Sequence, residues 1–250
     1  MTSHGARRTV VALGTLAALA SCSDGGSASV TEKPDTAASS VSTARPANPS
    51  ISQPGIPSVA EAMRQLDALR VTARESPERL GYSRSAFGNG WVDTDGNGCN
   101  QRDDVLLRDA VPGSVRVVGQ GACDHDVVAG VWIDPYTGAH LGFDNLKDQV
   151  QAQAIQIDHV VPLAEAWVSG ATDWSRDRRQ SFANDLAELL AVDGPTNASK
   201  GSGDPAAWRP KKEFQCDYAR RWIALKATWN LALDGSELRA LTEMLAFCES

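Results

Sequence analysis

The chain's hydrophobic and polar positions change pattern from segment to segment, and regular patterning begins near Ser58. From Val59 onward, apolar residues recur at helical spacing and predict an amphipathic helix that runs to about Val71. Helical patterns also cover residues 163–168, 176–185, 218–231 and 237–247.

Short aliphatic runs between these helices predict strands at residues 115–118, 127–133, 155–157 and 189–192. Residues 134–138 (Asp-Pro-Tyr-Thr-Gly) are typical of a turn, and the Gly-rich aromatic stretch 82–91 is typical of a loop. Asp193-Gly194-Pro195 stops the last strand, so that Thr196 or Asn197 can cap a new helix. Together these elements predict an α+β fold with a small hairpin among several helices.

The first residues have the features of an export signal. Arg7 and Arg8 precede an apolar run over residues 9–20, which is too short to span a bilayer as a mature helix. Leu19-Ala20-Ser21-Cys22 resembles a bacterial lipobox, in which the cysteine becomes the lipidated first residue. We therefore predict a signal peptide over residues 1–21 and a membrane anchor at Cys22; the alternative is an ordinary signal peptide followed by an unmodified Cys22.

Residues 22–57 are rich in Ser, Ala, Thr, Pro and Gly and carry few large apolar side chains. Such a segment cannot bury enough surface to offset the entropy of ordering it, so it predicts a flexible tether. The folded domain is expected over residues 58–250. No feature indicates a protein partner, and a monomer is expected.

Four cysteines remain once Cys22 is set aside, an even number that suits an exported, oxidising setting. None of them lies in a C-x-x-C pair, which argues against a structural zinc site. Four cysteines permit three connectivities, and proximity in the sequence favours Cys99–Cys123 and Cys216–Cys248.

One constellation carries most of the chemistry: Asp158 and His159 at the end of a predicted strand, followed later by Asn197. A neutral imidazole can take a proton from water near pH 7, which suits His159 to the role of general base. The Asp158 carboxylate and the Asn197 amide oxygen are hard ligands for Mg²⁺ or Mn²⁺. Two protein ligands leave positions open for water and phosphate oxygens, so the set predicts phosphodiester hydrolysis.

The order of Asp158 and His159 sets a condition on this site. Adjacent residues of a regular strand point to opposite faces. Both side chains can therefore serve one site only if the strand ends or twists there, which the following Pro162 favours.

These residues resemble the HNH, or His-Me finger, endonucleases. The match is closer to secreted bacterial HNH proteins related to the C-terminal nuclease domain of modification-dependent restriction enzymes. In those proteins Trp-x-Asp-Pro-Tyr-Thr-Gly precedes Ile-Asp-His-Val-Val-Pro-Leu, as residues 132–138 and 157–163 do here. Residues 182–186 and 197–208 also follow their pattern, and the resemblance covers about Tyr82 to Cys248.

The resemblance implies a ββα-metal core embedded among several helices. Its first strand ends at Asp158-His159, its second lies near residues 189–192, and its helix opens at Asn197. It implies that Asp158 and Asn197 bind the metal, that His159 is the base, and that Asn184 holds the loop that orients His159. Many HNH enzymes have His where Asn197 stands here, and the amide favours Mg²⁺ or Mn²⁺ over Zn²⁺.

Basic residues near the motif are candidates for substrate contact. Lys200 could contact phosphate or could be a solvated lysine in the first turn of a helix. Arg102 resembles a recurrent arginine of the secreted proteins and could face the substrate. Arg209 belongs to a basic cluster that could contact a nucleic-acid backbone or simply be a solvated surface; the cluster comprises Arg176, Arg178, Arg179, Arg209, Lys211 and Lys212.

A second metal site is suggested by residues 93–98, Asp-Thr-Asp-Gly-Asn-Gly. Alternating oxygen ligands at Asp93, Asp95 and Asn97 are typical of a structural Ca²⁺ loop, although the spaced Glu of such loops is missing. The alternative is a Gly-rich turn locked by Cys99.

The charge of the chain limits how it could bind nucleic acid. The net charge is −7, and Arg7 and Arg8 are the leader's only charged residues, so losing both takes −7 to −9. This argues against a broad basic DNA-binding face and makes a bound cation necessary. We expect a metal-dependent endonuclease acting on DNA, or less favourably RNA, outside the cytoplasm. The alternatives are a cell-wall hydrolase with paired carboxylates and a calcium-stabilised, non-catalytic envelope lipoprotein.

Overall fold

An antiparallel pair of strands followed directly by a helix forms the centre of the structure. The computed structural model describes residues 56–249, which belong to one compact unit. Strand β4 (Ile155–His159) pairs with β5 (Leu189–Asp193), and α6 (Gly194–Lys200) begins at the next residue. The α+β class and this pair of strands are confirmed. The predicted signal peptide, Cys22 and nearly all of the predicted tether lie outside the described residues.

The helix that follows β5 begins earlier than expected. Asp193, not Thr196 or Asn197, is its N-cap: the Asp193 carboxylate accepts a hydrogen bond from the Thr196 backbone N–H at 2.9 Å. Pro195 lies in the first turn, where its missing N–H costs no hydrogen bond. The predicted cap residues were wrong because a carboxylate three residues upstream satisfies the first free amides.

A three-stranded antiparallel sheet packs beside this centre, in the order β1 (Arg116–Gln120), β2 (Cys123–Ile133) and β3 (His140–Phe143). Helix α2 (Gln101–Asp109), which the sequence pattern did not reveal, packs on β2, and the Trp132 indole N–H donates to the Leu106 carbonyl at 2.9 Å. One hydrophobic cluster joins the sheet to the central pair through Val105, Leu106, Val127, Trp132, Ile155 and Leu189.

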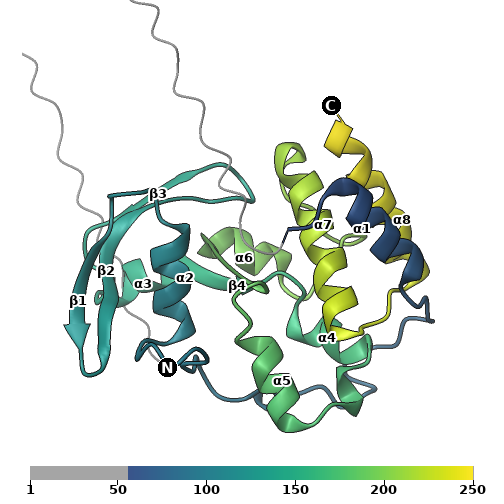
Figure 1. Ribbon diagram of the computed structural model, residues 1–250, viewed down its shortest axis with the longest axis horizontal. Coiled ribbons are helices and arrows are strands. Elements are labelled where there is room, and N and C mark those ends of the chain that lie inside the picture. Colours follow the sequence, from purple (N-terminus) through teal and green to yellow (C-terminus); the bar gives the residue numbers. More distant parts are fainter. Residues whose placement is uncertain (1–55, 250) are drawn as a thin grey trace, which may run out of the picture. The chain divides into compact units, whose positions relative to one another are not determined.

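Helices cover the other side of the strand pair, as Figure 1 shows with α1, α7 and α8 opposite the three-stranded sheet. Helix α1 (Val59–Ala68) ends before Val71, because Val71 forms a parallel bridge with Leu233 and the chain becomes extended there. Helix α7 is Lys212–Trp229, α8 is Gly235–Leu245, and the remaining α-helices are α3 (Gln149–Ala154), α4 (Leu163–Val168) and α5 (Arg176–Ala183). Three short 3₁₀ segments are Arg84–Phe87, Ala171–Asp173 and Ala246–Glu249. Among the described helices, none is both long and apolar enough to cross a membrane.

Two disulfides connect segments of this fold. Cys99–Cys123 joins the loop before α2 to the start of β2, and Cys216–Cys248 joins α7 to the C-terminal segment. This is the connectivity that proximity in the sequence favoured.

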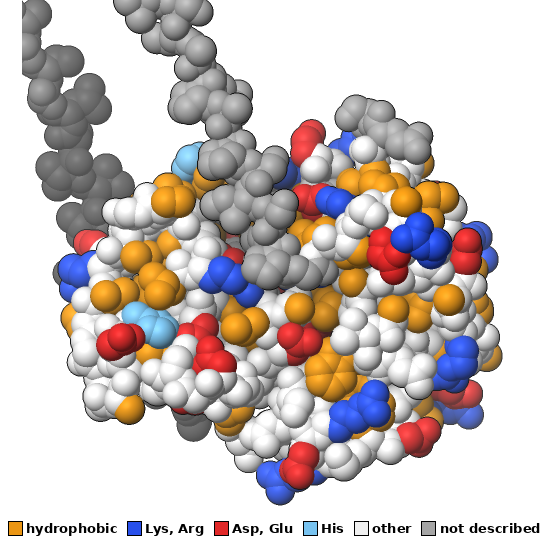
Figure 2. All heavy atoms as spheres, in the orientation of Figure 1, with side chains coloured by type: hydrophobic (Ala, Val, Ile, Leu, Met, Phe, Trp, Pro, Cys, Tyr) orange, Lys and Arg blue, Asp and Glu red, His pale blue; other side chains and the backbone are white. Residues whose placement is uncertain are grey.

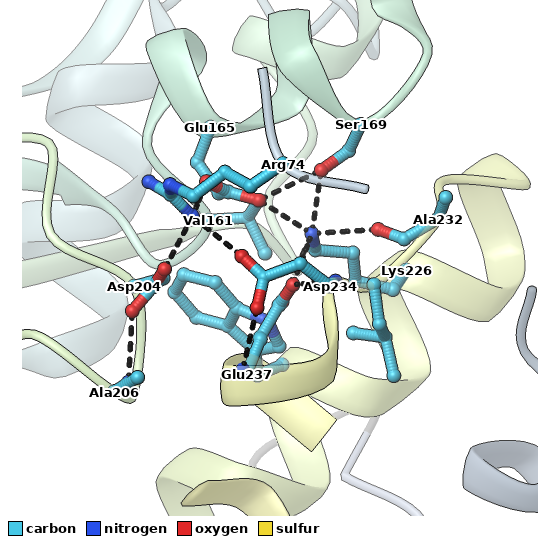
Figure 3. Close-up of polar contacts among 12 residues, drawn as sticks. Arg74, Val161, Glu165, Ser169, Asp204, Ala206, Lys226, Ala232, Asp234 and Glu237 are labelled. Carbon is cyan, nitrogen blue, oxygen red and sulfur yellow. Dashed lines mark hydrogen bonds and ion pairs between the residues drawn. The ribbon is translucent and has the colours of Figure 1, made fainter. Parts of the chain in front are cut away.

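A buried ion network ties the helical side together (Figure 3). Lys226 Nζ, with its side chain fully buried, lies 2.8 Å from a Glu165 oxygen and 2.9 Å from a Glu237 oxygen. Arg74 contacts Glu165 and two further carboxylates, Asp204 and Asp234. The network therefore fixes α4, α7, the start of α8 and the loop after α6 relative to one another.

Candidate active site

Strand β4 and helix α6 line a groove with a volume of about 370 Å³. Asp158 and His159 at the end of β4 and Asn197 on α6 all line it. The sequence-predicted base and ligands are thus brought together. The segment before α2 also lines the groove, with Pro77, Glu78, Tyr82 and Arg84.

His159 is held in a defined orientation. Its Nε2 lies 2.9 Å from the Ala183 carbonyl oxygen, so Nε2 carries the proton and donates it. Its ring stacks on the Trp91 indole with 5.6 Å between ring centroids and 17° between ring planes. Burial lowers the pKa of His159 to about 3, and the nearby cations Arg84 and Lys200 add to that effect. The imidazole is therefore neutral near pH 7, with Nδ1 available to accept a proton.

Asp158 is buried and surrounded by donors. The Tyr136 hydroxyl donates to Oδ2, and the Lys200 ammonium lies 3.0 Å from Oδ1 and 2.9 Å from Oδ2. Burial raises the pKa of Asp158, and the contacts with Lys200 and Tyr136 oppose that shift. A carboxylate offers about four acceptor positions, so these three contacts leave room for about one more.

Asn197 has an orientation that can be read from its neighbours. Gln156 Nε2 donates to the Gln153 carbonyl at 3.2 Å, so its Oε1 accepts from Asn197 Nδ2 at 2.9 Å. This leaves Asn197 Oδ1 without a hydrogen-bond donor among residues 56–249. Asp158 and Asn197, which both line the groove, offer a carboxylate and an amide oxygen as metal ligands. These oxygens fit a hard divalent cation such as Mg²⁺.

The neighbouring positions of Asp158 and His159 do not prevent a shared site. Strand β4 ends at His159, and the two side chains diverge to different partners while both line the same groove. Asp158 reaches Tyr136 and Lys200, and His159 reaches Ala183.

Asn184 lies behind the imidazole rather than in the groove. Its side chain is buried, its Oδ1 accepts from the Val92 backbone N–H at 3.0 Å, and its Nδ2 donates to the Gln180 carbonyl at 3.0 Å. These bonds connect the end of α5, next to Ala183, to the loop that carries Trp91. Asn184 thereby holds both residues that contact the His159 ring.

The structure gives each of the three predicted substrate-contact residues, Lys200, Arg102 and Arg209, partners within the protein, and their contact with substrate stays a prediction. The Lys200 side chain is fully buried against Asp158 and also donates to the His159 carbonyl at 2.8 Å. Arg102 donates to the carbonyls of Ala152 and Ile155, and Arg209 donates to Pro205 and Glu243. The charged groups of these three side chains therefore bind other parts of the protein itself.

The wider basic cluster also lies away from the groove. Arg178 covers the Trp174 ring, and Arg179 donates to the carbonyls of Ala86 and Trp174. None of the cluster's six side chains lines the groove within residues 56–249. On the face shown in Figure 2, basic and acidic side chains are interspersed rather than gathered into a basic surface.

Sequence reasoning missed two residues of the site, Arg84 and Trp91. Arg84 is exposed, lines the groove and lies close enough to His159 to lower its pKa. Both lie in the stretch 82–91 that was interpreted as a loop. The only signal was an arginine and a tryptophan in a Gly-rich aromatic segment, which by itself does not say what the segment contacts.

The suggested calcium loop is closed by its own hydrogen bonds. Asp93 accepts from the backbone N–H groups of Gly96 and Gly98, and Asn97 donates to Asp95 and Asp104. Among the described residues, the one group of His, Cys, Asp and Glu close enough to share an ion is Cys99, Cys123 and His125, and both sulfurs belong to a disulfide. A structural Ca²⁺ at this loop stays a prediction.

Comparison with known proteins identifies the chain's relatives. Residues 134–244 match the family model described as GmrSD restriction endonucleases, C-terminal domain. An uncharacterized secreted protein of the fungus Arthroderma benhamiae is 39% identical over 198 residues, which cover 78% of this chain and 88% of the relative. No solved structure matches the chain significantly. The chain thus belongs to the family that shares the C-terminal domain of the GmrSD restriction endonucleases.

Proposed function

We propose that this protein is a metal-dependent endonuclease that hydrolyses phosphodiester bonds of DNA outside the cytoplasm. The observation that carries the proposal is the orientation of His159: its Nε2 is bound to the Ala183 carbonyl, and its ring lines the same groove as Asp158 and Asn197. A nuclease-like activity is also what membership of the restriction-endonuclease family suggests.

His159 would act as the general base. Its low pKa keeps the ring neutral at pH 7, and the Ala183 carbonyl fixes the tautomer that leaves Nδ1 unprotonated. Nδ1 takes a proton from a water molecule as the water oxygen attacks phosphorus. The bond to the leaving oxygen breaks, and that oxygen keeps the electron pair and takes a proton from solvent. Asn184 acts as a positioning residue, because it holds the two segments that contact the ring.

Asp158 and Asn197 are the residues that would hold a divalent cation, for which Mg²⁺ or Mn²⁺ fits the oxygen ligands. When bound, the cation supplies charge stabilisation to the phosphate and the leaving oxygen. Burial raises the pKa of Asp158, and Lys200 opposes that rise from inside the protein by favouring the ionised carboxylate.

Export is supported by two observations. The two disulfides suit an oxidising compartment, and the fungal relative is named a secreted protein. Cleavage of the leader before Cys22 and lipidation of that residue belong to the same proposal, in which the tether holds the nuclease domain away from the membrane.

The test is digestion of nucleic acid by the oxidised protein without residues 1–21. Supercoiled plasmid, single-stranded circular DNA and RNA are each incubated with Mg²⁺, Mn²⁺, Ca²⁺ or EDTA. We expect cleavage of DNA with Mg²⁺ or Mn²⁺ and none with EDTA. A folded protein that leaves every nucleic acid intact under every metal would refute the proposal, and peptidoglycan degradation in EDTA would favour a cell-wall hydrolase.

A further inference from the structure

A second, smaller cavity adjoins the groove at His159. Its volume is about 160 Å³, and Arg84, His159 and Leu163 line both spaces. The hydrolysis proposed above needs only the groove, so the second cavity is left without a role. The residues that line it alone are Phe87, Gly88, Gly90, Trp91 and Ala183.

The lining of this cavity suits a flat, mainly apolar ring with a negative charge beside it. The rings of Phe87, Trp91 and His159 and two aliphatic side chains line it, and no carboxylate of residues 56–249 does. Its one permanent charge is Arg84, which is exposed and stands where the cavity meets the groove. The cavity is smaller than the ~300 Å³ at which pockets for drug-sized ligands begin, so it suits a single ring system.

The aromatic wall is held in place before any ligand arrives. Trp91 is half-buried, its indole stacks on His159, and the next residue, Val92, donates its N–H to Asn184. Gly90 has a φ of 89°, a conformation that other residues adopt at a cost, and a Cβ there would meet nothing within 4 Å. Because the Trp91 ring is already fixed and Gly90 leaves open space beside it, a flat ligand can stack there at little entropic cost.

We infer that this cavity binds the nucleobase of a nucleotide next to the scissile phosphate, and that the preferred substrate is single-stranded or locally unpaired DNA. The inference rests on the proposed function. A nucleotide contains a flat base linked to a phosphate. The base would occupy the cavity, and the phosphate would lie near Arg84, where the cavity meets the groove. A base within a duplex is stacked and paired, and it must leave the helix before it can enter such a cavity.

The charge of the chain supports the same substrate. Because the chain has a net charge of −7, its electrostatic attraction to the phosphate backbone is weak. Binding affinity for nucleic acid must therefore come from another interaction. Stacking of a base on an aromatic ring strengthens binding by about 5- to 150-fold and does not depend on the protein's net charge. Trp91 is the ring in the cavity that is accessible enough to serve, because Phe87 is buried.

The first test changes the substrate and leaves the protein intact. An abasic site is moved along an end-labelled single-stranded oligonucleotide, and the cut positions are mapped with Mg²⁺. We expect cutting to fall at least 10-fold at the phosphate on one side of the abasic site, while distant phosphates are cut as before. We also expect the single strand to be cut at least 10-fold faster than its duplex. Equal cutting beside and away from the abasic site would overturn the inference.

The second test measures binding without metal or cleavage. Fluorescence anisotropy in EDTA compares a short thymidine oligonucleotide with an abasic chain of the same length and charge. We expect the wild type and Trp91→Phe to prefer the oligonucleotide with bases by about 5-fold or more, and Trp91→Ala to lose that preference. A preference that survives Trp91→Ala would overturn the inference.

The two proposals fail in different ways. If no nucleic acid is cut under any metal, the proposed function is wrong, and the binding comparison in EDTA still decides whether the cavity recognises bases. If DNA is cut but base content affects neither cutting nor binding, the function stands and the nucleobase site is wrong.

Discussion

The ammonium of Lys200 lies 2.9 Å from Asp158 Oδ2, and both side chains are buried. This pair joins the end of β4 to the end of α6 and so fixes the strand that carries His159 relative to the helix that carries Asn197. A lysine placed here compensates the charge of the proposed metal ligand from inside the protein.

Loss of the Lys200 charge should destabilise the fold. In Lys200→Met, Asp158 becomes a buried charge without its cation, and we expect the free energy of unfolding to fall by about 3–5 kcal/mol. Urea denaturation in EDTA measures it. The control is Arg64→Met, which breaks the exposed pair with Glu61 and should cost about 0–1 kcal/mol. Equal stability of Lys200→Met and the wild type would show that the pair contributes nothing.

Removal of the proposed base should abolish cleavage. Replacing His159 by Asn keeps a polar group of similar size but removes the proton acceptor, and we expect the cleavage rate to drop by about 10²–10⁴-fold. His140→Asn, at an exposed position on β3, should leave the rate unchanged. The rates are measured with Mg²⁺ on single-stranded DNA, and both variants are checked for folding by thermal melting. Undiminished cleavage by His159→Asn would exclude it as the base.

Asn184 should act on the rate through the Trp91 loop. Asn184→Ala leaves the Val92 N–H without its acceptor, while the Gln180 carbonyl keeps the backbone N–H of residue 184 as a donor. The unsatisfied Val92 N–H should cost about 1–3 kcal/mol of stability. We expect kcat to fall more than KM rises, together with faster hydrogen exchange at the Val92 amide. Asn184→Asp keeps the acceptor for Val92 and should retain the slow exchange. A fall in kcat with unchanged exchange at Val92 would contradict this positioning role.

The two disulfides should contribute similar stability but different amounts to activity. They join residues 24 and 32 apart in sequence, for which the loop-entropy model gives about 3–4 kcal/mol each. Only Cys99–Cys123 anchors the loop that follows Trp91. We therefore expect the double Cys→Ser variant at Cys99 and Cys123 to lose more cleavage than the one at Cys216 and Cys248, at equal fraction folded. Equal loss in both variants would argue against the loop's part in catalysis.

Stability should depend on pH through Glu237. Burial raises the pKa of Glu237 to about 7, although Lys226 opposes the shift. A carboxyl whose pKa is raised on folding contributes stability that is fully present below its unfolded pKa of about 4.5 and is lost as the pH rises through 7. Between pH 5 and pH 8, the wild type should therefore lose more unfolding free energy than Glu237→Gln. Chemical denaturation at both pH values measures this; parallel pH dependence in the two proteins would contradict the raised pKa.

The fold was predictable where a local pattern is repeated over several residues. The strands around Ile157 and Leu190 and the long C-terminal helices follow from apolar spacing, with ends that differ by at most two residues except the start of α7, which lies six residues before the predicted one. Helix α2 (Gln101–Asp109) was not predictable, because its sequence begins with four polar or charged residues and its apolar side chains become informative only against Trp132. Similarly, nothing local shows that Val71 leaves α1 to pair with Leu233.

The sequence by itself determined which residues carry the proposed chemistry: Asp158, His159 and Asn197 follow from residue type and motif order. It also predicts an export leader, and it fixes the even number of cysteines beyond Cys22. Only the tertiary structure decided that Lys200 faces Asp158, that Arg102 and Arg209 hold the backbone, and that Arg84 and Trp91 border His159. The physical reason is that the direction of a charged or aromatic side chain depends on partners far away in the chain. Helical and strand periodicity report which face of an element is buried, and they carry no information about what that face meets.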